Sequence, residues 1–517
     1  MSTSEKAAKS AIIIIILTLG SKFLGFIREI FIAAKFGSGV ETDTFFVAIT
    51  ATSLITNLMS TAISTTFVPV LAEIEYKEGK DGKINHTNNI INIIFFFSLI
   101  LSVLAWISSP LIIKLLAKGF KGEQFKLAVE LNRIGLPMII FYCLTGALTG
   151  FLHSEQKYNS PAAVGFPFNF VYIFYLLFLS SMFGIKGLMV ASVIAVFSQI
   201  LIVIPEIRKT GYRYKFSIYL KDEYIKKVLY LSLPVFVGVA INDLNAIVDK
   251  TLASSLVSGS ISALNYANKL DSLVLGVFIS AITTVIFPLL AKESNNNNIE
   301  GMKKIMAYGI NLILLITIPA SVGLIVLAKP IVEIAFERGQ FDATATIMTS
   351  KALIFYSIGL VAMALRLLIT RVYYSLQDTK TPMINGAMSV GLNVVLNLIL
   401  MRFMAHAGLA LATSIATTVA TLLMLYGLRK KIGSLGTKGY VITFVKSGLA
   451  SAIMGIIAYF TYHGLFDLLG TSKLFNLVSL IVAVFIGVLV YGILCYILNV
   501  EEVKNLLKML KIKVIEG

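Results

Sequence analysis

One segment of the chain recurs without a gap at an offset of 221 positions, which favours a fold built from two similar halves. Residues 151–161 (FLHSEQKYNSP) align with residues 372–382 (VYYSLQDTKTP). The same offset pairs identical residues over a longer stretch: Ser154 with Ser375, Gln156 with Gln377, Pro161 with Pro382, Phe120 with Phe341, Gly187 with Gly408, Leu188 with Leu409, Ala191 with Ala412 and Ile194 with Ile415. In membrane proteins a substrate path commonly runs between two such copies, so the repeat makes transport the leading hypothesis.

The composition is that of a polytopic membrane protein. Of the 517 residues, 57% are hydrophobic and 14% are charged, whereas soluble domains are about 45–50% apolar. A helix needs about 20 apolar residues to cross about 30 Å of hydrocarbon. We therefore predict an all-α fold with fourteen transmembrane helices, near residues 11–35, 43–70, 89–117, 127–152, 160–183, 186–206, 226–256, 261–291, 305–329, 345–375, 382–403, 406–428, 440–463 and 473–497.

The basic residues follow the predicted loops. A net charge of +17 can indicate a nucleic-acid partner, but here no single soluble module collects the charge, and we expect no such partner. With the amino terminus inside, lysine and arginine gather in the cytoplasmic loops and are sparse in the opposite ones. This positive-inside pattern predicts a multi-pass protein of the cell membrane with both termini in the cytoplasm.

The repeat also predicts the domain organisation. Position 28 in the first helix falls on position 249 in the seventh, so each lobe contains six helices: an N-lobe at 1–221 and a C-lobe at 222–431. An even number of spans makes the repeat parallel, with its axis along the membrane normal. The last two helices, in 432–517, have no partner in the repeat. They serve either for packing or as a lateral groove for a lipid.

The carboxyl-terminal stretch 500–512 (VEEVKNLLKMLKI) has apolar residues at helical spacing with lysines between them. This pattern predicts an amphipathic helix on the inner membrane surface, with a solvated tail as the alternative.

Enzyme motifs are missing from the chain. It has no GxxxxGK[ST], GxGxxG or HExxH motif, and its four histidines, at 86, 153, 406 and 463, are scattered. We therefore predict a transporter rather than an enzyme, with no catalytic residues and no cofactor.

Several charges lie where they are costly. A charge at the centre of a span costs about 2.5–3.5 kcal/mol on insertion scales, yet Lys22, Arg28, Glu29 and Lys35 all fall within the first predicted helix, and Asp43 begins the next. At 100° per residue Arg28 and Lys35 share one face, while Lys22 and Glu29 share another. Either a bend gathers these side chains, or Lys22 and Glu29 pair with each other.

The seventh and eighth predicted helices carry a matching set of charges: Asp243, Asp249, Lys250, Lys269 and Asp271. The repeat predicts that both sets face a central cavity. Cations there, namely Lys22, Arg28, Lys250 and Lys269, favour an anionic substrate, most naturally a phosphate or diphosphate. The alternative is that long side chains reach the interface from helix ends, which fits Lys35 and Lys250 best.

The sequence resembles the MurJ lipid II flippases of the MOP superfamily along its whole length. The segments that carry the resemblance are SKFLGFIREIFIAAKFG (21–37), TDTFFVA (42–48), ISTTFVPVLAE (63–73), VDKTLAS (248–254), GSISALNYANKLDSL (259–273) and SLQDTKTP (375–382).

This resemblance implies a bacterial inner-membrane protein of peptidoglycan synthesis. Such a protein moves lipid II to the outer leaflet by alternating access, and its partners are lipid II and membrane lipids; we expect a monomer. Lys22, Arg28 and Lys269 match cationic positions of the family, and Asp43 matches an acidic one. Some members carry basic residues where this chain has Thr56 and Asn57. The alternatives are an exporter of another polyprenyl-diphosphate glycan and a MATE-like ion-coupled antiporter.

The resemblance further implies a sodium site in the second lobe. The matching residues here are Asp249, Asn393, Asn397 and Thr413, with the Leu409 carbonyl as a further donor. All of them offer the hard oxygens that such an ion prefers. Alternatively, the asparagines form hydrogen bonds across helices and Asp249 pairs with Lys250 or Lys269.

Overall fold

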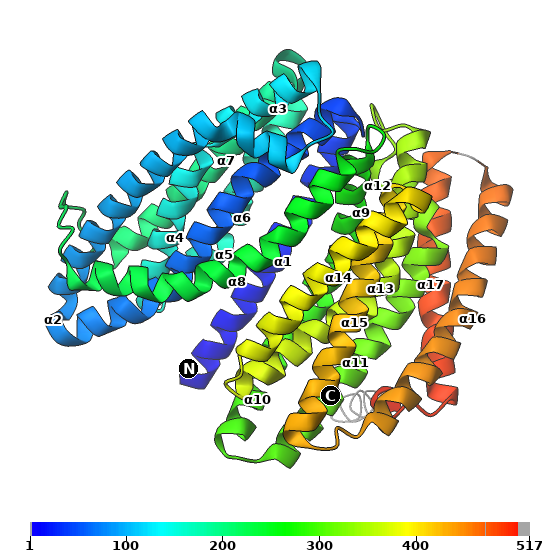
Figure 1. Ribbon diagram of the computed structural model, residues 1–517. Coiled ribbons are helices and arrows are strands. Elements are labelled where there is room, and N and C mark those ends of the chain that lie inside the picture. The colour runs from blue at the N-terminus through cyan, green and yellow to red at the C-terminus, as the bar shows by residue number, and fades with distance from the viewer. Residues whose placement is uncertain (1–2, 471, 505–517) are drawn as a thin grey trace. The chain divides into compact units, whose positions relative to one another are not determined.

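In the computed structural model, which describes residues 3–470 and 472–504, every regular element of the described chain is a helix (Figure 1). The predicted all-helical class is confirmed. The elements are α1 (Thr3–Phe36), α2 (Val40–Leu116), α3 (Gly122–Gly135), α4 (Met138–Ser154), α5 (Asn159–Ala163), α6 (Gly165–Phe174), η1 (Tyr175–Leu179), α7 (Ser180–Lys209), α8 (Glu223–Ala253), α9 (Ser260–Val274), η2 (Leu275–Ile279), α10 (Ser280–Asn295), α11 (Ile299–Val326), α12 (Ala328–Phe336), α13 (Ala343–Ser375), α14 (Lys380–Met404), α15 (His406–Ile432), α16 (Thr437–Leu469) and α17 (Lys473–Ile497).

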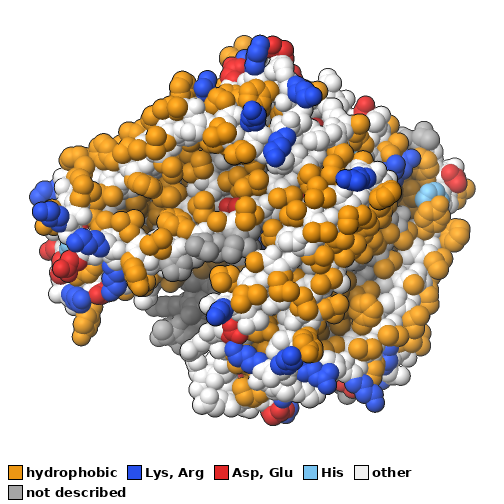
Figure 2. All heavy atoms as spheres, in the orientation of Figure 1, with side chains coloured by type: hydrophobic (Ala, Val, Ile, Leu, Met, Phe, Trp, Pro, Cys, Tyr) orange, Lys and Arg blue, Asp and Glu red, His pale blue; other side chains and the backbone are white. Residues whose placement is uncertain are grey.

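Ten helical segments of the described chain are long and apolar enough to cross a membrane. The predicted polytopic membrane fold is confirmed at this level. Figure 2 shows hydrophobic side chains along the helix flanks, while basic and acidic side chains collect near helix ends. This distribution is the one that a bilayer selects, because its core offers no partner for a charge.

The helices form two compact units. The first consists of Met1–Ser262 and Arg338–Phe341, and the second of Ala263–Glu337 and Asp342–Gly517. In the first unit α2 packs against α3, α4 and α8, and α1 packs against α6. In the second, α13 packs against α11 and α15, and α16 against α11 and α17. The lobes predicted from the repeat stay a prediction, because units defined by packing do not test a division by repeat.

The charged segment between the second and third predicted spans, residues 71–88, is helical rather than a loop. α2 runs through it for 77 residues and is broken only at Gly79, where φ is 71° and ψ is −171°. Glutamate and lysine favour helix, so the charged joint extends the apolar helices on both sides. A glycine supplies the positive φ at little cost.

The offset of 221 reappears in the backbone. Gln156 and Gln377 have φ values of 56° and 58°, and Gly184 and Ala405 have 56° and 49°. A positive φ at a residue other than glycine costs about 1–3 kcal/mol. Gln156 and Gln377 both accept this cost, and together with the second pair they indicate that the same helix ends and restarts recur in each half.

Each unit has its own apolar core, formed by helices that touch at small residues. In the second unit a Cβ added to Gly359 of α13 would lie 2.7 Å from the Cα of Ser414 on α15. The helix backbones can approach this closely only because glycine has no side chain there. In contrast, a Cβ added to Gly391 of α14 would meet no atom within 4 Å.

We expect Gly359→Ala to destabilise the second unit by about 1–3 kcal/mol, because the added methyl group forces α13 and α15 apart. Thermal unfolding can be followed with a thiol-reactive dye, since Cys143 and Cys495 are free and buried. The matched control Gly391→Ala should leave the melting temperature unchanged or raise it slightly. Equal melting curves for the two variants would contradict the close packing.

Candidate functional site

A buried ion pair lies within α1. Nη2 of Arg28 lies 2.7 Å from Oε1 of Glu29, and the two side chains are 15% and 5% exposed. Nη1 of Arg28 donates to Oδ1 of Asn169 on α6 at 3.2 Å. The guanidinium also lies over the rings of Phe168 and Tyr172, 5.3 and 5.0 Å from their centroids. The aromatic faces and the carboxylate together stabilise a cation that would otherwise be costly at this depth.

Asn169 fixes this arrangement between two helices. Its Nδ2 donates to the carbonyl oxygens of Ser21 on α1, at 3.1 Å, and Gly165 on α6, at 2.8 Å. Its oxygen accepts from Arg28. The Nε–H of Arg28 is buried and has no hydrogen-bond partner in the described chain. One donor of a fixed guanidinium therefore remains for another acceptor.

The other predicted cations lie on different elements. Lys22 is exposed on α1. Lys250 is half-buried on α8, with Nζ 5.8 Å from the centroid of the Phe46 ring. Lys269 is half-buried on α9, in the second unit, where Asp271 of the same helix is buried. Their role in binding a substrate stays a prediction.

Asn57, one of the two positions where the sequence departs from the family resemblance, contacts an acidic side chain. The Asn57 side chain on α2 forms a hydrogen bond with the carboxylate of Asp243 on α8. Oδ2 of Asp243 is buried without a partner in the described chain. At position 57 this chain therefore places a neutral amide against a carboxylate.

Asp43 lies in the first turn of α2, and its side chain caps the start of α9. It is 3% exposed, and its two carboxylate oxygens accept from the backbone amides of Gly259 and Ser262, both at 2.7 Å. The hydroxyl of Ser262 donates to the same carboxylate. A carboxylate at a helix N-terminus accepts hydrogen bonds from backbone amides that have no partner within the helix. Its negative charge also interacts favourably with the helix dipole. The contacts explain why an acidic residue occupies this position.

Three further contacts join helix ends and loops of the same unit. We give the name loop cluster to the residues of these contacts together with Asp43 and its partners, namely Ala34, Ser38, Asp43, Gly119, Ser254, Gly259, Ser262 and Gln340. Ser38 donates to the Gly259 carbonyl at 3.0 Å, and the backbone amide of Gln340 donates to the Ala34 carbonyl at 2.9 Å. The amide of Gly119 donates to the Ser254 hydroxyl at 3.1 Å. All these residues belong to the first unit. The contact of Gln340 with Ala34 explains why residues 338–341 belong to that unit although the residues before and after them do not.

Four of the five predicted sodium ligands come together in the second unit. Asn397 on α14 donates to Oδ1 of Asn393 at 2.8 Å, Asn393 donates to Oγ1 of Thr413 on α15 at 3.2 Å, and Thr413 donates to the Leu409 carbonyl at 3.1 Å. Asn393 and Asn397 are buried. Asp249 belongs to the first unit, where it accepts from Asn245 at 3.4 Å.

This oxygen-rich chain suits a hard cation such as Na⁺, since its ligating groups are two buried side-chain amides, the half-buried hydroxyl of Thr413 and a backbone carbonyl. It also shows the cross-helix hydrogen bond of the alternative interpretation, from α14 to α15. No group of three His, Cys, Asp or Glu side chains suited to a metal ion occurs in the described residues.

Sequence analysis missed two features of this region. It did not find Asn169, although an asparagine within the apolar run GFPFNFVYIF is itself a signal, because an amide there needs partners. It also did not find the ion pair between Arg28 and its neighbour Glu29; a pairing of Lys22 with Glu29 stays a prediction. Adjacent helix residues seldom face each other, so helix periodicity alone does not predict the contact between Arg28 and Glu29.

Comparison with known proteins gives one family. The family model described as "Lipid II flippase MurJ" matches residues 32–479. A probable lipid II flippase MurJ of Buchnera aphidicola subsp. Acyrthosiphon pisum is 30% identical over 493 residues, covering 94% of this chain and 95% of that protein. A probable lipid II flippase MurJ of Rickettsia prowazekii is 29% identical and covers 96% of this chain and 99% of its own length.

Two solved structures are similar in fold. A structure described as lipid II flippase MurJ in an inward closed conformation has a TM-score of 0.80 and 29% identity, and covers 94% of this chain and 98% of its own. An inward-facing MATE family transporter of the MOP superfamily has a TM-score of 0.68 and 17% identity over 82% of this chain and 99% of its own. At that identity the second likeness concerns the fold alone.

We expect Asp43→Ala to destabilise the protein by about 1–3 kcal/mol, because the buried amides of Gly259 and Ser262 lose their acceptor. The matched control is Asp342→Ala, which removes a local cap that accepts only from Ala345 within its own helix, at 2.8 Å. The control should cost about 1 kcal/mol. Thermal unfolding of the two variants measures the difference. An Asp43→Ala variant no less stable than the control would contradict the role of the loop cluster.

Proposed function

This chain belongs to the lipid II flippase MurJ family, and we propose that it moves lipid II from the inner to the outer leaflet of the bacterial cell membrane. The observation that carries the proposal is the family match along residues 32–479, supported by relatives of nearly the same length. The buried guanidinium of Arg28 is consistent with an anionic headgroup as substrate.

We propose fourteen crossings with both termini in the cytoplasm. Of the ten apolar segments, 40–116 and 159–209 contain 77 and 51 residues. Each is long enough for two crossings at about 20 residues per crossing, and each is broken by a glycine with positive φ, Gly79 or Gly184. α1 and α8 add the remaining two. The positive-inside pattern supports this orientation.

The barrier to flipping is the transfer of a diphosphate headgroup through hydrocarbon. A polar path lowers it by replacing water with donors and positive charge. In this proposal Arg28 is one such group. Because Glu29 already neutralises Arg28, a diphosphate competes with this carboxylate for the guanidinium. The competition limits how tightly the headgroup is held, which favours its release after each passage.

The membrane potential supplies a direction for the transport. One elementary charge moving across 100 mV is worth about 2.3 kcal/mol, so a headgroup with a charge of about −2 gains about 4.6 kcal/mol on leaving a negative interior. Sodium entering through the second unit would add to this driving force. With the proposed topology the loop cluster lies at the outer surface.

The test is replacement of the native flippase by variants in a host depleted of it. Arg28→Ala should fail to support growth and should leave lipid II on the inner leaflet. Loss of a charge-assisted contact worth about 1.5–3 kcal/mol lowers the transport rate about ten- to a hundredfold.

The matched control is Arg133→Ala. Arg133 lies on α3 over the Trp106 ring, 4.3 Å from its centroid, and takes no part in the proposed path.

Glu29→Gln should bind lipid II more tightly and turn over more slowly, because the competing charge is gone. Normal growth with Arg28→Ala would overturn the role of this residue. Accumulation of a different polyprenyl-diphosphate glycan in the depleted host would instead support the alternative exporter.

Sodium binding is tested by thermal stability. A ligand at 100 times its dissociation constant stabilises a protein by about 2.7 kcal/mol, so Na⁺ should raise the melting temperature where K⁺ does not. We expect Asn397→Ala to abolish this difference. Ser389→Ala, which lies one helical turn before Asn393 on α14, should retain it. A sodium response unchanged in Asn397→Ala would exclude the site.

A further inference from the structure

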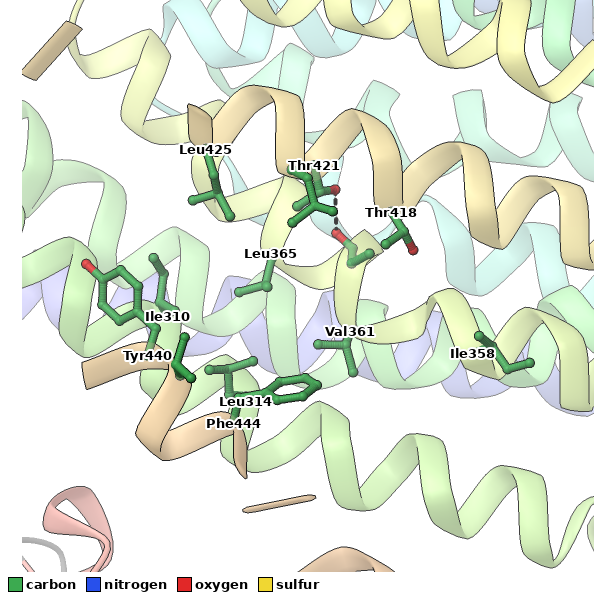
Figure 3. A pocket seen from close by; sticks show the side chains of 13 residues that line it. Ile310, Leu314, Ile358, Val361, Leu365, Thr418, Thr421, Leu425, Tyr440 and Phe444 are labelled. Carbon is green, nitrogen blue, oxygen red and sulfur yellow. Dashed lines mark hydrogen bonds between the residues drawn. The ribbon is translucent and has the colours of Figure 1, made fainter. Parts of the chain in front are cut away.

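A cavity of about 430 Å³ lies within the second unit, lined by residues of α11, α13, α15 and α16. Figure 3 shows aliphatic and aromatic side chains around it, among them Leu314, Val361, Leu365 and Phe444. The hydroxyl of Thr421, one of its few polar groups, donates to the Ala362 carbonyl at 3.0 Å. The lining therefore has little need of water, and an apolar occupant suits it.

The cavity opens toward the lipid side of the helices. Three of its lining side chains, Leu422, Val441 and Phe444, are 60%, 58% and 51% exposed. They lie on apolar stretches of helices long enough to span a membrane, so in the cell this opening faces hydrocarbon. A chain from the bilayer can enter it without crossing a polar layer.

Basic residues mark one end of the cavity. α11 begins at Ile299, α15 ends at Ile432 and α16 begins at Thr437, so these three helix ends lie at one side of the membrane. Each carries a basic residue there, Lys303, Arg429 and Lys438 respectively. Arg429 and Lys438 form no ion pair with any residue that the structure describes.

The helical register places these cations above the cavity. Arg429 follows the lining residues Leu425 and Leu422 by four and seven positions, which keeps it on their face of α15. By the same reasoning Lys303 precedes Ile310 by seven positions on α11, and Lys438 precedes Val441 by three on α16. The Nζ of Lys303 lies 3.9 Å from the Cβ position of Gly433, so the lysine reaches the α15–α16 connection.

The charged residues near Lys303, Arg429 and Lys438 leave this end of the cavity with a net positive charge. Lys303 forms an ion pair with Glu300 at 2.8 Å, and Lys431 is held by Asp378 at 2.8 Å. The Nζ of Lys430 lies 4.6 Å from the centroid of the Tyr426 ring. Arg429 and Lys438 are therefore the strongest candidates to contact a phosphate. Tyr440 follows Lys438 by two positions on α16, where tyrosine commonly marks the membrane interface.

We propose that this cavity is a binding site for an anionic phospholipid of the bilayer, with one acyl chain in the cavity and its phosphate over Arg429 and Lys438. One turn of helix, about 6 Å, separates Arg429 from the apolar lining, so one molecule can reach both. The site is separate from the Arg28 region and does not depend on the flipping of lipid II.

An apolar cavity in the first unit provides a comparison. It measures about 600 Å³ and is lined by α6, η1 and α7, including Val190. The lysine closest in sequence to its lining, Lys186, is paired with Glu130 at 2.7 Å. It therefore offers room for an acyl chain without the cluster of cations.

The experiment uses the full-length protein in detergent without lipid II, titrated with phosphatidylglycerol or phosphatidylcholine of identical chains. Native mass spectrometry counts the lipids retained. The wild type should retain phosphatidylglycerol preferentially. The double variant Arg429→Gln, Lys438→Gln should lose about tenfold or more of that affinity, since each cation near a lipid surface contributes about 1 kcal/mol.

A matched pair of substitutions tests the cavity itself. Val441→Trp fills the mouth and should reduce retention of phosphatidylglycerol, whereas Val190→Trp, at the comparison cavity, should not. Both positions are largely exposed, at 58% and 45%, so neither change disturbs a core. Unchanged retention in the charge variant, or an equal loss in both tryptophan variants, would overturn the proposal. Preferential retention of undecaprenyl phosphate would assign the cavity to the substrate tail and overturn it as well.

Discussion

The structure of the first unit depends on how a cation is kept within an apolar helix. An arginine at that depth is costly, about 2.5–3.5 kcal/mol on insertion scales, and Arg28 meets this cost with a carboxylate, an amide oxygen and two aromatic faces. Asn169 makes the arrangement specific, because the same amide joins α1 to α6. The nearly neutral pair can stay in the membrane, and yet a stronger anion can compete for it.

The loop cluster serves a different purpose, because it supplies hydrogen-bond partners to backbone groups at helix ends that have no partner within their own helix. Asp43 satisfies the amides at the start of α9. Close backbone contacts require glycine: Gly339 has φ of +61°, and a Cβ added there would lie 2.1 Å from the Ala34 carbonyl. These contacts are strong individually but few.

Sequence analysis predicted the helical membrane fold from the length of the apolar runs and identified the family from the resemblance of six segments. The lobes expected from the 221-residue offset stay a prediction. Sequence analysis could not predict which side chains meet. The contact between Arg28 and Asn169 joins residues 141 positions apart, and the role of Asp43 as a cap depends on a loop that packs beside it. The helical joint around Gly79 was missed because a charged segment between two apolar runs resembles a loop. Asn393, Asn397 and Thr413 were expected together from the family resemblance, and hydrogen bonds join them with the Leu409 carbonyl.

The central claim is that this protein carries a diphosphate-linked lipid headgroup across the membrane. The most direct measurement uses purified protein in vesicles that contain fluorescent lipid II on one leaflet, with a membrane-impermeant reagent that quenches only the outer surface. The account predicts that protein-containing vesicles expose lipid II far faster than protein-free vesicles, and faster still with a negative interior. Exposure at the protein-free rate, at any imposed potential, would contradict it.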